Sequence, residues 1–215
     1  MKKLLYTLAL SVLALGAYAQ KDIRLNGYGA YVFDDKFDTY YSSSVYVNGK
    51  IKGGFMWGAG LEVGIRDDYG AELSYYRLDT KAPIYLAGIR DRTIDLGINY
   101  IMLGGMRYLL VANEKIEPYG GLLLGMAIFS NKNPQGSEES SATKFAWGAR
   151  LGTNIWLSDR FGIKLQAYVL SAVQGAGGGL YFGTGGAGAG VSTYSTMYQF
   201  GLGGGLVIRL TPAAE

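Results

Sequence analysis

The chain has 215 residues, a formal net charge of +3 and only 17% charged residues, with 34 Gly and 18 Tyr. It contains no Cys and no His, which excludes disulfide bonds, a thiol nucleophile, a Ser-His-Asp/Glu charge-relay site and His metal ligands. Its Lys and Arg residues are scattered rather than clustered, so the sequence offers no electrostatic footprint for nucleic acid.

The first 20 residues have the pattern of an export signal. A basic start is followed by an apolar run from Leu4 to Leu15 and by the small-residue pattern Ala17-Tyr18-Ala19. This order predicts a secretory signal peptide over residues 1–19 and a mature domain over 20–215. The apolar run is shorter than the roughly 20 residues that a membrane helix needs, and no other segment reaches that length. Any membrane span must therefore be built from strands.

Eight strand-like runs follow the signal. The run Phe55–Ile65 is the clearest, because apolar residues at odd positions alternate with Gly, Met or Glu at even ones. The runs are expected at 23–33, 55–65, 69–79, 93–109, 117–129, 143–157, 161–173 and 194–210. An amphipathic strand of about ten residues, turned tightly onto the next, is the repeating unit of a transmembrane β-barrel.

The connections between these runs alternate in length. Short polar turns are expected at 66–68, 111–115 and 158–160, and long connections occupy 34–54, 80–92, 130–142 and 174–193. Such sorting is typical of an outer-membrane barrel, with brief periplasmic turns, longer extracellular loops and both termini in the periplasm. The sequence therefore predicts an all-β fold, a closed antiparallel transmembrane barrel of eight strands in an up-and-down meander.

The apolar face of each strand is expected to point outward to lipid. The opposite face is dominated by Gly with one or two charges a strand, whereas a soluble barrel needs polar groups along its whole exterior. In the run 93–109 the apolar face from Ile94 to Tyr100 is placed outward, opposite Asp95 and Asn99. The run 117–129 is apolar on both faces around Leu123, and its sides are left unassigned.

This orientation places polar side chains in the lumen and aromatic side chains at the two membrane interfaces. The expected interior polar network consists of Glu62, Glu72, Asp95, Arg107, Arg150, Lys164, Gln166, Gln199 and Arg209. Paired charges filling a barrel of about eight strands predict a plug rather than an open pore, with a narrow ion pathway as the alternative. The expected aromatic girdles are Tyr31, Phe33, Phe55, Trp57, Tyr75, Phe145, Trp147 and Tyr194 at one end and Tyr69, Tyr108, Tyr119 and Phe161 at the other.

Two long connections carry aromatic residues that could contact a partner. Tyr40, Tyr41 and Tyr46 lie in a Ser-rich stretch, and Tyr181 and Phe182 lie in a Gly-rich one. Tyr/Ser-rich exposed loops are typical of recognition surfaces, although they are as often mere extensions of strands above the membrane.

The whole mature chain resembles the OmpA/OmpX-like small outer-membrane β-barrel family. The segments that carry the resemblance are FMWGAGLEVGI, YGAELSYYRL, EPYGGLLLGMAIF, FAWGARLGTNIWL and FGLGGGLVIRL. It implies an exported protein of the outer membrane of a Gram-negative-type cell. The last strand ends at Leu210, where members of the family usually carry an aromatic residue that similar proteins present to the barrel-assembly machinery.

From these observations we expect a structural or surface-interaction protein. The alternatives are a narrow channel or transporter for small or hydrophobic solutes, and a secreted lipocalin-like carrier if the apolar faces point inward. The outer-membrane enzymes of this architecture use a catalytic His, so no enzyme is expected. We further expect a monomer that contacts outer-membrane lipid or lipopolysaccharide, meets the barrel-assembly machinery during biogenesis, and uses no cofactor, metal or nucleic acid.

Overall fold

The computed structural model describes residues 22–42, 45–66, 68–86, 89–132, 141–173, 179–183, 186–190 and 197–211. Its strands are β1 (Ile23–Val32), β2 (Asp35–Ser42), β3 (Val45–Ile51), β4 (Gly54–Arg66), β5 (Tyr69–Leu86), β6 (Ile89–Tyr108), β7 (Ile116–Asn131), β8 (Ser141–Trp156), β9 (Phe161–Val173), β10 (Gly179–Gly183), β11 (Gly186–Gly190) and β12 (Met197–Arg209). No helix within these ranges is long and apolar enough to cross a membrane.

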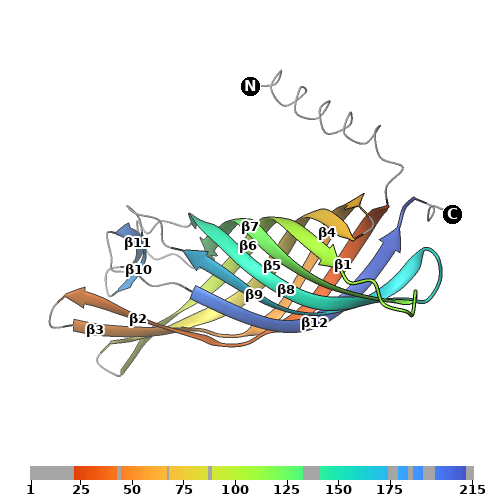
Figure 1. Ribbon diagram of the computed structural model, residues 1–215. Helices are drawn as coiled ribbons and strands as arrows, with labels where there is room; N and C mark the ends of the chain where they lie inside the picture. Colours follow the sequence, from red (N-terminus) through yellow and green to blue (C-terminus); the bar gives the residue numbers. More distant parts are fainter. Residues whose placement is uncertain are drawn as a thin grey trace, which may run out of the picture.

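Eight of these strands form a closed antiparallel barrel (Figure 1). Their order around the wall is β1, β4, β5, β6, β7, β8, β9 and β12, and β12 returns to pair with β1. Each strand is joined to its neighbour in the chain, so this is the up-and-down meander that the alternating runs predict. Exposed and buried side chains alternate along β4 from Phe55 to Val63 and along β9 from Phe161 to Tyr168, and a one-residue slip would reverse both faces of these strands.

Strand pairing extends beyond the expected runs at one end of the barrel. β5 and β6 continue pairing as far as Leu86 and Ile89, well past the expected end at residue 79. Most of the connection 34–54 forms the hairpin of β2 and β3, and β3 pairs with β5 over Val47–Gly49. A second small hairpin, β10 with β11, lies in the connection 174–193.

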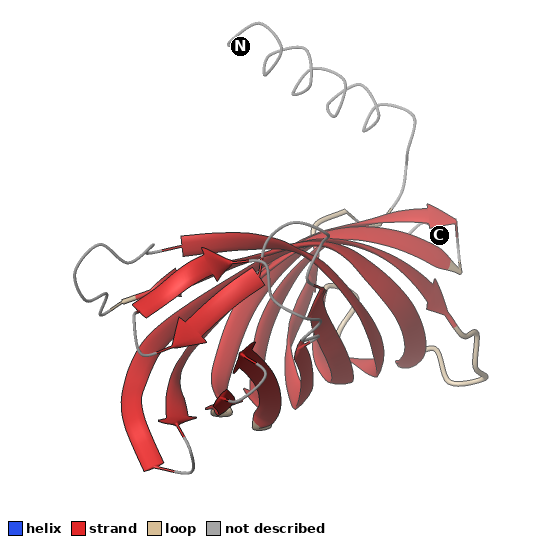
Figure 2. Ribbon diagram, turned by 90° about the vertical axis from the view of Figure 1, so that its left-hand side faces the viewer, coloured by secondary structure: helices blue, strands red, loops and turns tan. Residues whose placement is uncertain are grey.

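The two ends of the barrel differ in what they carry. The short connections, the start of β1 and the end of β12 lie at one end, here called the turn end, and the β2–β3 and β10–β11 hairpins lie at the other, the loop end (Figures 1 and 2). At the turn end the Leu210 N–H donates to the Ile23 carbonyl at 2.7 Å, and the Ile23 N–H donates to the Thr211 hydroxyl at 2.9 Å. The chain ends are thus fastened to each other where the barrel closes.

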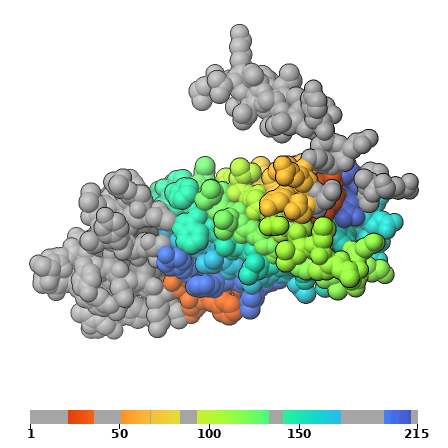
Figure 3. Space-filling view, in the orientation of Figure 1, coloured from red at the N-terminus to blue at the C-terminus, as the bar shows by residue number. Residues whose placement is uncertain are grey.

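Large apolar side chains are exposed along the outer wall of the barrel. Figure 3 shows one side of this wall in space-filling form. Phe55 is 66% exposed, whereas Glu62 and Arg150 are each 1% exposed. The exposed apolar residues include Leu25, Leu61, Ile65, Leu73, Leu103, Leu122, Leu124, Leu151, Leu165, Leu202 and Leu206. Burying that much apolar wall requires lipid, so the membrane orientation holds and the inward-facing arrangement of a soluble lipocalin-like carrier does not.

Candidate functional site

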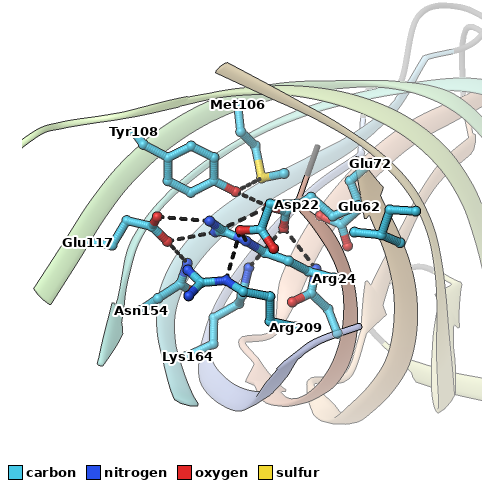
Figure 4. A network of polar contacts seen from close by, with 12 residues as sticks. Asp22, Arg24, Glu62, Glu72, Met106, Tyr108, Glu117, Asn154, Lys164 and Arg209 are labelled. Atoms are coloured by element: carbon cyan, nitrogen blue, oxygen red, sulfur yellow. Dashed lines mark hydrogen bonds and ion pairs between the residues drawn. The ribbon is translucent and has the colours of Figure 1, made fainter. Parts of the chain in front are cut away.

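The lumen near the turn end is occupied by a network of charged side chains (Figure 4). Arg24 of β1 donates two parallel hydrogen bonds to Glu117 of β7, from Nη1 at 2.7 Å and from Nη2 at 3.0 Å. Its Nε donates to Asp22 at 2.6 Å, and Arg209 of β12 donates to the same Asp22 oxygen at 3.0 Å. Two arginines and two carboxylates therefore close the turn end of the lumen.

The buried carboxylate of Glu62 in β4 contacts side chains from three other strands. It accepts a hydrogen bond from Asn26 Nδ2 at 3.0 Å and a short one from the Tyr108 hydroxyl, and its Oε2 lies 3.7 Å from Lys164 Nζ. Lys164 also lies 4.7 Å from the centre of the Tyr119 ring. The Tyr28 ring centre lies 5.9 Å away, so one carboxylate and two aromatic rings surround the buried ammonium.

Glu72 of β5 and Arg150 of β8 form a buried ion pair near the middle of the barrel. The Tyr28 hydroxyl donates to the other Glu72 oxygen, and Arg150 Nη1 lies 3.3 Å from the hydroxyls of Tyr28 and Tyr76. Gly60 makes room for this group, because a Cβ at residue 60 would collide with the Glu72 carboxylate.

Toward the loop end the lumen becomes apolar. The buried side chains there include Val32, Met56, Leu78, Leu96, Ile98, Met102, Phe129, Leu170 and Met197. Tyr76 and Tyr168 stack at the boundary, with ring centres 6.4 Å apart, and Gly201 leaves the space that the Tyr168 ring fills. Beyond them the Tyr100 hydroxyl donates to the Gln199 side-chain oxygen at 2.7 Å.

Several of these contacts cross the full width of the barrel. In a ring of eight strands, β1 lies opposite β7, β5 opposite β9, and β6 opposite β12. Arg24 with Glu117, Tyr76 with Tyr168, and Tyr100 with Gln199 join these three opposite pairs at successive depths. Side chains that meet across the diameter fill the lumen at those depths.

Four residues lie elsewhere than the sequence predicts. Asp95 and Arg107 belong to the outer wall: Asp95 Oδ1 lies 3.8 Å from Lys81 Nζ, and Arg107 lies 5.4 Å from the Tyr69 ring centre. Tyr108 and Tyr119, expected in a girdle, are buried in the lumen with ring centres 6.0 Å apart. In β6 the face from Ile94 to Tyr100 is buried, so the expected orientation of this strand is wrong over that stretch.

The other expected site residues are placed as follows. Gln166 accepts a hydrogen bond from the Tyr119 hydroxyl at 3.1 Å, and Arg209 lies at the turn end with its guanidinium 4.0 Å from the Trp156 ring centre. Tyr31, Phe33, Phe55, Trp57, Phe145, Tyr69 and Phe161 are exposed on the outer wall, and Tyr75 and Trp147 are partly exposed there. Tyr194 and the side chains of Tyr40, Tyr41, Tyr46, Tyr181 and Phe182 lie outside the described part of the structure.

Sequence reasoning missed several residues that complete the lumen. Asp22, Arg24, Asn26, Tyr28, Tyr76, Glu117, Asn154 and Tyr168 all line it. Strand parity could have found some of them: Arg24, Asn26 and Tyr28 share one face of β1. Among the described residues no group of three or more acidic side chains could hold a metal ion.

A second charged group lies on the outer wall at the loop end. Arg77 and Lys132 both approach Asp79 Oδ1, each at 2.7 Å. Burial alone would raise the pKa of Asp79, but hydrogen bonds from Lys132 and Arg77 and their charges outweigh it. The pKa of Asp79 therefore lies below its usual value of 3.8.

A closed wall of eight antiparallel strands, apolar outside and polar within, defines the class of transmembrane β-barrel proteins. Known structures share this fold at low sequence identity. The chain is similar to Neisserial surface protein A over 87% of its length and 97% of that protein, with 12% identity and a TM-score of 0.59.

Two other solved outer-membrane proteins are similar to a comparable degree. AlkL, solved in lipid bilayers, has 14% identity and a TM-score of 0.55 over 92% of this chain and 94% of its own. OprG from Pseudomonas aeruginosa has 14% identity and a TM-score of 0.54 over 87% of this chain and 96% of its own. No family model matches the sequence, and no curated protein matches it. The chain has the fold of the small eight-stranded outer-membrane barrels, which the OmpA/OmpX-like resemblance predicts.

Proposed function

We propose that this chain is an integral outer-membrane protein whose barrel is plugged by its own side chains and whose role is structural or is exercised at the loop end. The observation that carries the proposal is the set of contacts across the lumen. Arg24 with Glu117, Glu72 with Arg150 and Tyr100 with Gln199 occupy three depths. A solute would have to break each buried pair in turn, and separating one buried ion pair costs several kcal/mol.

A solute channel is the competing function, and single-channel recording separates the two. The protein refolded into planar phospholipid bilayers should give no conductance above that of the bare membrane. As a positive control, Glu72→Ala with Arg150→Ala removes the central pair and widens the lumen, so sporadic conductance is expected if the variant still folds. Steady ion-selective conductance by the natural protein would overturn the plug.

The surface role is tested at the β2–β3 hairpin, the longest described extension outside the barrel wall. Because Phe37 pairs with Gly49, residues 38–48 can be replaced by Asn-Gly while the base of the hairpin remains. Binding of vesicles that carry the protein to candidate cells or matrix components should fall to background. Unheated protein should still run faster on gels than boiled protein, as expected of a closed barrel. Unchanged binding after this replacement would place the contact surface elsewhere.

A further inference from the structure

The outer wall of β5, β6 and β7 carries a cluster of charges directly beyond the aromatic band. Along the outward face of β5, Leu73 and Tyr75 are followed by Arg77, Asp79 and Lys81. Together with Asp95 of β6 and Lys132, which directly follows β7, these three residues make up what we call the rim cluster. Trp57 packs edge-on against Tyr75, with ring centres 5.8 Å apart, so the rim cluster begins at the level of the membrane interface.

Contacts between strands hold the cations of the rim cluster in place. Arg77 Nη1 donates to Asn99 Oδ1 at 2.7 Å, and the Tyr75 hydroxyl donates to the same oxygen at 2.8 Å. Asp79 also binds Arg77 of β5 and Lys132, which directly follows β7, a strand that does not neighbour β5 in the wall. One carboxylate thus holds a guanidinium and an ammonium side by side.

The rim cluster is positive and accessible, and it lies on the side of the barrel formed by β5, β6 and β7. Three cations against two carboxylates leave a net charge of +1. The side chains of Lys81 and Lys132 are 66% and 44% exposed, whereas Arg77 is 21% exposed. Near the loop ends of β1 and β12 the exposed wall is aromatic instead, with Tyr31, Phe33, Tyr198 and Phe200.

We propose that the rim cluster binds the phosphate of a lipid headgroup in the membrane leaflet around the loop end. Arg and Lys side chains are the usual ligands of phosphate, and long basic side chains next to an apolar surface extend their charges to the headgroup level. Lys81 and Lys132 contact the phosphate, and Arg77, fixed by Asn99 and Asp79, supplies the third positive charge. The acyl chains of the same lipid lie along Leu73, Ile101 and Leu103, which are exposed on the wall directly below.

The test uses the full barrel in nanodiscs of zwitterionic phosphatidylcholine titrated with bisphosphorylated lipid A, with bound lipid counted by native mass spectrometry. Each surface Lys or Arg contributes about 1 kcal/mol to binding an anionic lipid, which corresponds to about fivefold in affinity. Lys81→Gln and Lys132→Gln should each weaken lipid A binding by about that factor. Lys115→Gln, at an exposed position of the turn end, removes the same charge and should change nothing.

Asp79→Asn separates lipid binding from a purely structural ion-pair network. If the cations bind phosphate, removing the competing carboxylate should tighten lipid A binding by a few fold, opposite in sign to Lys132→Gln. If the rim cluster only fastens β5 to β7, both substitutions loosen the same contact and change lipid retention in the same direction. That outcome would overturn the proposal, as would equal affinity for dephosphorylated lipid A or displacement by inorganic phosphate at equimolar concentration.

Discussion

The turn-end and loop-end halves of the barrel differ in which side of the wall carries the charged side chains. Near the turn end the buried side chains are charged, as Glu62 and Lys164 are, and the outer wall is apolar. Near the loop end the buried side chains are apolar, as Leu96 and Phe129 are, and the wall carries the rim cluster. The medium outside the wall accounts for the difference. The turn-end half is surrounded by lipid and needs an apolar outer wall, whereas the loop-end half meets water, where a polar wall can surround an apolar core.

The reversal takes place within single strands. On the outward face of β5 the residues change from Leu73 and Tyr75 to Arg77, and on β6 they change from Ile101 to Asn99. The inward faces change in the opposite sense, from Glu72 to Leu78 on β5. On β5 and β6 we therefore infer that the apolar part of the membrane ends near Tyr75 and Ile101.

The largest effect is expected from removing one partner of the buried Glu72–Arg150 ion pair. Glu72→Ala should cost about 3–5 kcal/mol of unfolding free energy, because the buried guanidinium of Arg150 loses its carboxylate partner. The measurement is reversible urea unfolding from phospholipid vesicles. The matched double variant Glu72→Leu with Arg150→Met replaces the pair by apolar groups and should cost about 1 kcal/mol or less. Equal costs for both variants would mean that volume, and not the unpaired charge, matters at this depth.

A second test places one charge on each half of the outer wall. Leu122→Arg lies in the apolar band and should cost about 2–4 kcal/mol, as Arg does at a bilayer midplane. Thr143→Arg, on the outward face of β8 near the loop end, should change the unfolding free energy by less than about 0.5 kcal/mol. The same vesicle unfolding assay measures both, and a similar cost at the two sites would contradict the proposed membrane boundary.

The third test concerns the hydrogen bond within the apolar half. Tyr100→Phe leaves the buried Gln199 oxygen without its donor and should cost about 1–3 kcal/mol. Adding Gln199→Leu removes the unpaired oxygen as well and should restore most of that loss. A double variant less stable than Tyr100→Phe would show that Gln199 has another role in the lumen.

The smallest expected effect is the pH dependence of the rim cluster. Because the pKa of Asp79 is lowered in the folded protein, its ion pairs add stability above pH 4 and lose it as the pH falls through the folded pKa. The gain is below about 1 kcal/mol, since the pair is largely exposed and screened by salt. Comparing the natural protein with Asp79→Asn at pH 7 and pH 3 measures it, and the difference should be smaller at the lower pH.

The fold was readable from the sequence because the membrane imposes one rule on most strands. The run 55–65 and the stretch 161–169 alternate without interruption, and their faces lie as the alternation predicts. The run 93–109 was misread from Ile94 to Tyr100 because the rule of apolar side chains outward was extended beyond the membrane. There the soluble rule applies, so Asp95 lies on the wall and its apolar neighbours are buried.

The partners within the lumen could not be read from the sequence. Arg24 and Glu117 are separated by 93 residues, and their meeting depends on the stagger between strands on opposite sides of the barrel. For Tyr108 and Tyr119, strand parity could have indicated the lumen instead of a girdle, but the contact between the two rings depends on how β6 and β7 are paired. Local patterns give the face of a strand, but only the closed geometry gives the neighbour across it.

Pairing between the first and last wall strands has a consequence for how the chain reaches its native state. All other strand pairs of the barrel wall join strands that follow one another in the chain. The pairing of β1 with β12 instead brings together residues as far apart in sequence as Arg24 and Arg209. The entropy cost of loop closure is largest for contacts between residues far apart in the chain. We therefore expect β1 and β12 to pair after the hairpins have formed. The Asp22–Arg209 ion pair then stabilises the pairing of β1 with β12 once the other strands are paired. Removing it should slow barrel closure more than hairpin formation.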